Sequence, residues 1–172
     1  MKNKLMHYMR LLAKRILRRI NLGDIAIRHH YTQDKIVLHS FKHRKYWYHD
    51  DNREKETMMV LAELIREGDL VIDVGGHIGY VTLYFAKLVG PGGKVVVFEP
   101  GPNNLPYIRK NVSVASNIIV AEKAVTDFAG KVTLYVENLT GLNNSLLVDY
   151  EPLDNNARNA GITSIDRNAV EV

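Results

Sequence analysis

The sequence contains no cysteine among its 172 residues. Disulfide bonds and thiolate metal ligands are therefore excluded, and the composition permits a cytoplasmic location. No apolar run is long enough for the core of a signal peptide or for a helix that spans a membrane. Internal repeats and low-complexity linkers are also missing, and 46% of the residues are hydrophobic. We therefore expect a globular, cytoplasmic protein that buries a sizeable core.

Acidic residues are missing from the start of the chain, where the first one is Asp24. Seven lysine and arginine side chains precede it, so the basic excess behind the net charge of +4 is local. The same segment carries an apolar residue at every third or fourth position, as on one face of a helix: Leu5, Met9, Leu12, Ile16 and Ile20. Residues 1–20 are therefore expected to form a basic amphipathic helix.

Two interpretations of residues 1–20 stay open. In one, the helix packs on the domain and exposes its basic face to solvent. In the other, it lies on an anionic membrane surface and makes the protein membrane-peripheral. Nucleic acid is not an expected partner, because Tyr8 is alone among these basic residues and single-stranded nucleic acids are bound on several aromatic platforms.

A small β-hairpin is expected next, because Ile25–Ile27 and Lys35–Leu38 are short strand patterns separated by polar residues. Five histidines lie between residues 29 and 49, and two aspartates follow directly. Imidazoles and carboxylates can bind metals, but their spacing here does not fit a helix face, so no metal site is predicted. We expect solvated histidines in a substrate-side cap, with residues 1–52 forming the helix and the cap.

The most informative stretch is Val71–Tyr80, in which an apolar strand ends in Asp73 and runs into a glycine-rich turn and a helix. Gly75, Gly76 and Gly79 allow sharp turns and a close approach to a ligand. The free N–H groups at the start of the following helix favour an anionic group. This pattern predicts a loop that binds a nucleotide or a related cofactor.

A second strand, Lys94–Phe98, ends at Glu99, 23 residues after Gly76 by sequence number. In a nucleotide-binding β-α-β unit, an acidic residue at this position reaches the hydroxyl groups of a ribose. The glycine spacing does not fit a dinucleotide fingerprint, because Val74 stands where the first glycine is needed. An NAD-dependent oxidoreductase is therefore the weaker alternative.

These motifs resemble those of the FkbM-type methyltransferases, which use S-adenosylmethionine. The resemblance covers roughly residues 53–136. The motifs that carry it are Val71–Tyr80, then Phe98–Pro100 with Asn103 and Asn104, and finally Ala124–Asp127 before Gly130 and Val132. It implies a Rossmann-like α/β class I methyltransferase fold over residues 53–172, with S-adenosyl-L-methionine as cofactor. It also implies methyl transfer to a hydroxyl oxygen, often on a sugar or polyketide.

The site expected from the motifs and the resemblance can be given residue by residue. The candidate cofactor-binding residues are Asp73, Gly75, Gly76, His77, Gly79, Glu99, Ala124 and Val125. His77 could contact the ligand or act as a base, or it could be a solvated loop residue. Ala124 and Val125 are assigned to an adenine pocket by the resemblance alone. No catalytic base and no acceptor substrate can be assigned.

Helix patterns connect these strands. Asp51 and Glu54 have the spacing of a capping box, and Gly68 would end the helix that they begin. A second helix is expected to turn four residues toward the core: Val81, Tyr84, Phe85 and Leu88. A third helix is expected around Ile108. Pro106 must lie in its first turn, because proline is not tolerated further inside a helix.

The rest of the chain carries weaker patterns. Strands are expected at Ile118–Ala121 and Val132–Val136, with a shorter candidate at Leu146–Val148 and no clear element between Ile165 and Val172. The FkbM family continues into a further strand with an Asp-Val-Glu-Gly-like segment, which does not occur before Val172. The fold is therefore expected to be incomplete and to associate with itself through an open sheet edge. A non-catalytic, membrane-associated nucleotide-binding module is the remaining alternative.

Overall fold

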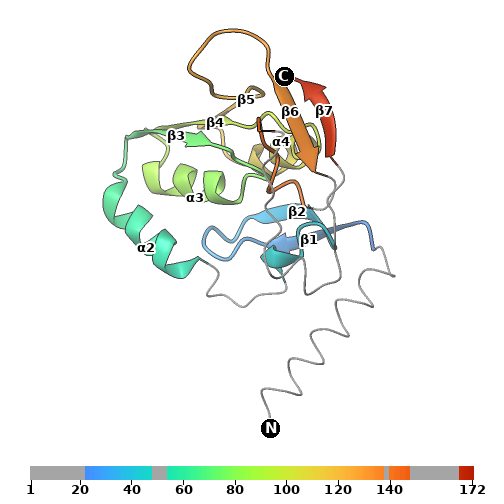
Figure 1. Cartoon of the computed structure of the whole chain (residues 1–172). Helices are drawn as coiled ribbons and strands as arrows, with labels where there is room; N and C mark the ends of the chain where they lie inside the picture. The colour runs from blue at the N-terminus through green and yellow to red at the C-terminus, as the bar shows by residue number, and fades with distance from the viewer. Residues whose placement is uncertain (1–21, 48–53, 138–139, 148–166) are drawn as a thin grey trace.

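A computed structural model of the chain describes residues 22–47, 54–137, 140–147 and 167–172 (Figure 1). The described elements, in chain order, are β1 (Asp24–Arg28), β2 (Lys35–His39), the short 3-10 helix η1 (Arg44–Tyr46), α2 (Lys55–Leu64), β3 (Leu70–Val74), α3 (Tyr80–Val89), β4 (Lys94–Phe98), α4 (Leu105–Val112), β5 (Ile118–Ala121), β6 (Thr133–Glu137) and β7 (Arg167–Glu171). The basic helix expected at residues 1–20 lies outside the described residues, as do His49, Asp50 and Asp51.

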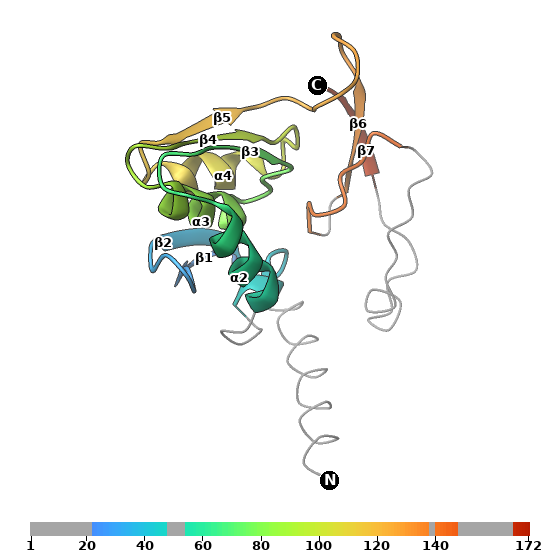
Figure 2. The same ribbon diagram turned by 90° about the vertical axis from the view of Figure 1, so that its left-hand side faces the viewer.

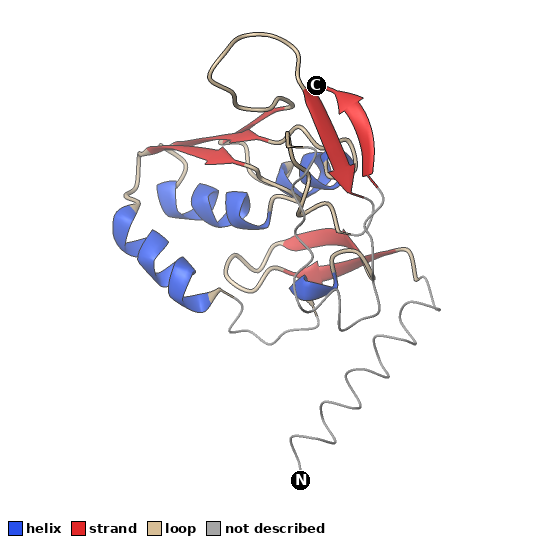
Figure 3. Cartoon of the chain, in the orientation of Figure 1, coloured by secondary structure: helices blue, strands red, loops and turns tan. Residues whose placement is uncertain are grey.

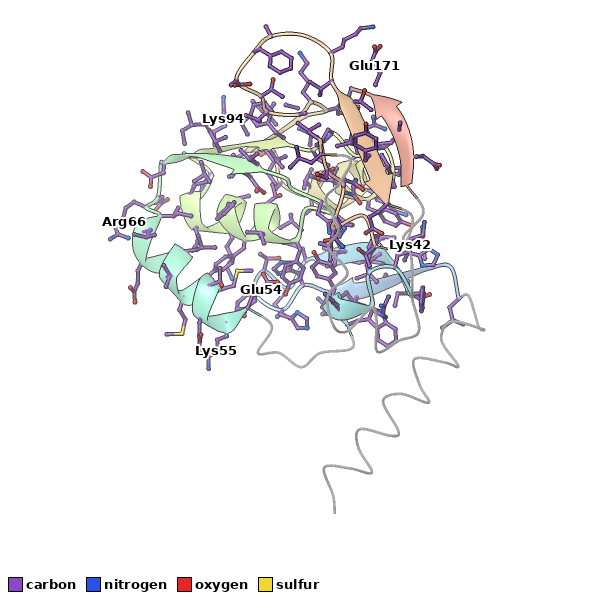
Figure 4. All side chains as sticks on the ribbon, viewed as in Figure 1. Lys42, Glu54, Lys55, Arg66, Lys94 and Glu171 are labelled. Atoms are coloured by element: carbon purple, nitrogen blue, oxygen red, sulfur yellow. The ribbon has the colours of Figure 1, made fainter. Side chains whose placement is uncertain are left out.

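Three strands form a parallel sheet in the order β3-β4-β5, and α3 and α4 connect them (Figure 3). The central strand β4 is rich in β-branched residues, and Val95 and Val97 are fully buried. The two predicted parallel crossovers are confirmed. Lys94 marks the end of the sheet where β4 begins (Figure 4), so the carboxyl ends of the strands point toward β6 and β7.

The predicted hairpin is confirmed, because β1 and β2 pair antiparallel with Ile25 opposite Leu38. It lies beneath α3 and α4, on the side away from the sheet, so the described chain forms three layers (Figure 2). Ile36 and Leu38 are fully buried in one core with side chains of the loop before α3, α3 itself, β4 and α4. The boundary at residues 52 and 53 stays a prediction, since hairpin and sheet share this core.

Helix α3 packs against the core with more of its surface than the predicted face. Its buried apolar side chains are those of Tyr80, Leu83, Ala86 and Val89. The predicted four, at positions 81, 84, 85 and 88, are half-buried, and Val81, Tyr84 and Phe85 pack against the edges of the core. The helix is apolar almost all round and lies between the sheet and the hairpin, so its sequence pattern does not select one inward face.

Two element boundaries also differ from the predictions. Helix α2 begins at Lys55, with Glu54 in a left-handed conformation and without a side-chain capping bond, and it ends four residues before Gly68. At the other end, residues 167–171 form β7, which pairs antiparallel with β6, where no clear element was expected. The predicted β6 is confirmed, and its alternating residues Leu134 and Val136 are buried. Near the shorter strand candidate, only Ser145 forms an isolated bridge, to Tyr135, and Val148 lies outside the described residues.

The histidines of the hairpin region are not all solvated, which corrects the sequence prediction. His29 is fully buried, where Nε2 donates to the Tyr80 carbonyl over 2.8 Å and the two rings stack at 4.0 Å. His43 is also buried, and its Nδ1 accepts the backbone N–H of His39 over 3.0 Å. Burial lowers the pKa of His29 to about 4 and that of His43 to about 3. Both imidazoles are therefore neutral parts of the core.

We expect the free energy of unfolding to fall as the pH drops below 6.5, the ordinary pKa of the histidines once the chain is unfolded. The folded state resists protonation down to about pH 4 for His29 and about pH 3 for His43, so acid favours the unfolded chain. For His43 the loss is on the order of 1–2 kcal/mol by pH 5. Urea unfolding at several pH values measures it. His43→Asn, which keeps an acceptor for the His39 N–H, should show a shallower dependence, and an unchanged slope would contradict the assignment.

The face of the parallel sheet away from α3 and α4 is apolar and open among the described residues (Figure 2). Leu70, Ile72 and Val74 on β3 are each more than 60% exposed. No described helix is long and apolar enough to cross a membrane. Self-association through an open sheet edge stays a prediction.

Candidate functional site

A cavity of about 250 Å³ lies where the three parallel strands end. It is walled by the loops that follow β3 and β4, by the segment after β5, by Leu134 of β6 and by residues 141–146. The carboxyl edge of a parallel sheet is where ligands bind in open α/β folds. The cavity therefore occupies the position that the sequence predicted for the cofactor.

Five of the eight predicted site residues line this cavity: Gly75, His77, Glu99, Ala124 and Val125. The other three, Asp73, Gly76 and Gly79, are not among its lining residues. The sequence motif thus contains two kinds of residue, one that faces the cavity and one that builds the loop around it.

Asp73, the acidic residue of β3, is hydrogen-bonded to α3, the helix that follows the glycine loop. The Thr82 hydroxyl of α3 donates to its Oδ2 over 2.6 Å. Burial raises the pKa of Asp73, and the bond from Thr82 opposes the rise. This contact fixes the end of β3 against the first turn of α3, so the loop between them is closed at its base.

The three glycines of the loop have different roles. Gly75 has a φ of +90° and no atom within 4 Å of where a Cβ would lie, so its backbone is open to an approaching ligand. At Gly76 a Cβ would lie 2.2 Å from Cγ2 of Val97, which means that the loop presses directly on β4. Gly79 has a φ of +83° and begins α3 against Val112 of α4.

Glu99 is buried, with 4% of its surface exposed, and three donors surround its carboxylate. Oε2 accepts the backbone N–H of His77 over 2.7 Å. Oε1 accepts the backbone N–H of Gly101 over 2.8 Å and the side-chain amide of Asn104 over 3.1 Å. Burial raises the pKa of Glu99, and these hydrogen bonds oppose the rise. The glycine loop and the loop after β4 therefore meet at this carboxylate.

His77 has a φ of +53° and is buried, so it is not a solvated loop residue. Its Nδ1 lies 3.0 Å from the Tyr46 hydroxyl and its Nε2 lies 3.1 Å from the Thr140 carbonyl. A carbonyl only accepts, so Nε2 carries the proton and Nδ1 accepts from Tyr46. Both ring nitrogens are thus engaged in joining η1 and the segment after β6 to the glycine loop, which leaves neither in position to act as a base.

The sequence prediction missed the cavity wall formed by residues 141–146. Asparagine amides hold this wall to the loop after β4. Asn104 donates to the Gly141 carbonyl over 3.0 Å, and Asn144 donates to Oδ1 of Asn103 over 2.9 Å. Gly141 has a φ of +75°, and a Cβ there would lie 2.2 Å from Oδ1 of Asn104. The sequence did contain a possible signal for this wall: two adjacent asparagines after Glu99 and a later Gly-Leu-Asn-Asn run. These two segments show no periodic pattern, so nothing in the sequence indicates that they are in contact.

Among the described residues, no group of three or more histidine, aspartate or glutamate side chains could hold a metal ion. The remaining polar lining residues are Lys123, which follows β5, and Asn144 and Ser145 of the far wall. The polar part of the described cavity lining thus includes one buried carboxylate, Glu99, and one lysine, Lys123.

Residues 73–172 match the model of the methyltransferase FkbM domain, which is 100 of the 172 residues. The chain belongs to the FkbM methyltransferase family. The predicted family, the Rossmann-like α/β fold and S-adenosyl-L-methionine as the cofactor of this family are thereby confirmed. No curated protein matches the chain.

Solved methyltransferase structures are similar to part of the chain. A SAM-dependent methyltransferase from Aquifex aeolicus is 29% identical over 43% of this chain and 42% of its own, with a TM-score of 0.39. Fibrillarin from Aeropyrum pernix, solved with S-adenosyl-L-methionine, is 20% identical over 60% of this chain and 41% of its own, with a TM-score of 0.37. Trm5b from Pyrococcus abyssi is 18% identical over 59% and 29%, with a TM-score of 0.45. The FkbM chain thus spans less than half the length of each.

The residues of the FkbM chain fit the cofactor of the family on two observations. The backbone at Gly75 borders open space beside the cavity, so a ligand can approach it closely. Glu99 presents a buried carboxylate to the same cavity, where a ribose hydroxyl can donate to it. Ala124 and Val125 also line the cavity and add an apolar surface to it, and their contact with the adenine stays a prediction.

Proposed function

We propose that this chain binds S-adenosyl-L-methionine in the cavity at the carboxyl ends of β3, β4 and β5 and serves methyl transfer to a hydroxyl oxygen of a small molecule. The observation that carries the proposal is the buried Glu99 carboxylate, which lines the cavity and is held by the glycine loop. The acceptor class, a sugar or polyketide hydroxyl, rests on the resemblance to the family.

When bound, S-adenosylmethionine supplies an electrophilic methyl group on a sulfonium. The residues of the chain orient it. Glu99 accepts from the ribose, the loop at Gly75 lets the backbone approach, and Ala124 and Val125 offer an apolar wall to the base. Such positioning lowers a barrier by roughly 7–11 kcal/mol in well-oriented intramolecular reactions. The proposed chemistry is thus mainly positional.

Removal of the hydroxyl proton does not fall to His77, because its ring nitrogens already serve Tyr46 and the Thr140 carbonyl. Its proposed role is to hold the far wall of the cavity in place. Lys123, Asn144 and Ser145 are the other polar side chains on the cavity surface among the described residues. We assign the removal of the hydroxyl proton to none of them.

The direct test is calorimetry of the full chain with S-adenosylmethionine and, in parallel, with NAD. We expect heat of binding with the first and none with the second, because Val74 occupies the turn position that a dinucleotide site gives to glycine. Binding of S-adenosylhomocysteine, which lacks the methyl group, serves as a control for the shared nucleoside. Saturable binding of NAD alone would overturn the proposal.

A further inference from the structure

The carboxylate of Glu99 has a definite hydrogen-bonding capacity, and most of it is already used. A carboxylate offers about four acceptor positions, two on each oxygen. Oε1 accepts from Gly101 and Asn104, and Oε2 accepts from His77. Three positions are therefore filled by the chain itself, and the one that remains belongs to Oε2.

Of the three donors, two are backbone N–H groups, and Asn104 supplies the side-chain donor. Asn104 is buried with 2% of its surface exposed and lies at the start of α4. Its amide nitrogen donates to Oε1 of Glu99 and also to the Gly141 carbonyl. Both partners are acceptors, so this orientation of the amide is required, because the flipped amide would turn its oxygen toward them.

Asn104 makes no side-chain capping bond to α4, although it occupies the N-cap position. Its oxygen Oδ1 is buried without a hydrogen-bond partner among the described residues. An unsatisfied buried oxygen is unfavourable, so the amide is held there by its two donor contacts. These contacts join the Glu99 carboxylate to the cavity wall at Gly141.

We propose that Asn104 is a positioning residue that fixes the Glu99 carboxylate so that a single acceptor position, on Oε2, remains for a single ribose hydroxyl. This inference rests on the proposed function. It narrows the expectation that Glu99 binds both hydroxyls of the ribose. The second hydroxyl would then bind elsewhere or remain in water.

The first measurement needs no variant. The affinity of the wild-type chain for S-adenosylhomocysteine is compared with its affinities for the 2′-deoxy and 3′-deoxy analogues by calorimetry. We expect loss of one hydroxyl to weaken binding about tenfold, the equivalent of one hydrogen bond to a charged group, and loss of the other to change it by less than about threefold. Equal losses from both analogues would overturn the single-hydroxyl assignment.

The second measurement uses Asn104→Ala between about pH 5 and pH 8. Binding needs the ionised carboxylate, so affinity falls as the pH drops through the pKa of Glu99, which burial already raises. Removing the Asn104 donor removes a contact that favours the charged form, so this fall should begin at a higher pH in the variant. Two other groups that act on the pKa of Glu99 are unchanged in the variant: Asp73, which raises it, and the backbone N–H of His77, which lowers it.

Asn103→Ala is the matched control. Asn103 adjoins Asn104 and takes part in the same wall, through the Glu137 carbonyl and Asn144, but it has no hydrogen bond to Glu99. We expect it to keep the wild-type pH dependence and the wild-type preference between the two analogues. An equal pH shift in both variants, or none in Asn104→Ala, would overturn the positioning role. If the wild type does not bind S-adenosylhomocysteine, the proposed function itself fails, whereas the variant results bear on Asn104 alone.

Discussion

Glu99→Ala is expected to weaken binding of S-adenosylmethionine by about 1.5–3 kcal/mol, or roughly 10- to 150-fold. The buried carboxylate is the one acidic group that lines the cavity within the described part of the chain. A ribose hydroxyl that donates to it gains a charge-assisted hydrogen bond, which alanine cannot replace. Calorimetry at neutral pH measures the loss.

Glu99→Gln separates the charge from the shape of the side chain. Glutamine keeps one oxygen for the Gly101 and Asn104 donors, but its amide nitrogen then faces the His77 N–H or the ligand and can accept from neither. We therefore expect binding as weak as in Glu99→Ala, with a fold closer to wild type in thermal unfolding. Wild-type affinity in a folded Glu99→Gln protein would show that the Glu99 carboxylate does not bind the ligand.

The sequence predicted the part of the site that follows from short-range rules. β3 and β4 are apolar runs that end at Val74 and Phe98, beside Asp73 and Glu99, and the topology of parallel crossovers brings those ends to one edge. The roles within the loop could not be predicted from the same pattern. The spacing does not distinguish Gly75, which borders open space, from Gly76, which lies against β4.

The far wall of the cavity could not be predicted because it depends on contacts between distant residues. Asn104 and Gly141 are 37 positions apart, and their hydrogen bond has no signature in either local sequence. The same applies to His77, whose ring is fixed by Tyr46 and Thr140, 31 and 63 positions away. Long-range polar pairs of this kind follow the packing of the whole core, which periodicity does not encode.

Gly76→Ala is expected to destabilise the fold by about 1–3 kcal/mol or more. The new methyl group would lie 2.2 Å from Cγ2 of Val97 and 2.8 Å from Cδ1 of Ile108. Ile108 can move the end of its side chain, but Val97 is branched at Cβ and fully buried in the central strand, so β4 or the loop must shift. Either shift disturbs the hydrogen bonds from Gly75 and Gly76 to the Phe98 carbonyl.

Gly92→Ala is the matched control for this substitution. Gly92 lies in the turn before β4, has no atom within 4 Å of an added Cβ and does not require a left-handed backbone. Alanine there should change the free energy of unfolding by less than about 0.5 kcal/mol, as exposed substitutions usually do. Urea unfolding of the two variants and the wild type at neutral pH gives the comparison. Similar stability of Gly76→Ala and Gly92→Ala would show that the loop does not press on β4 as closely as the structure indicates.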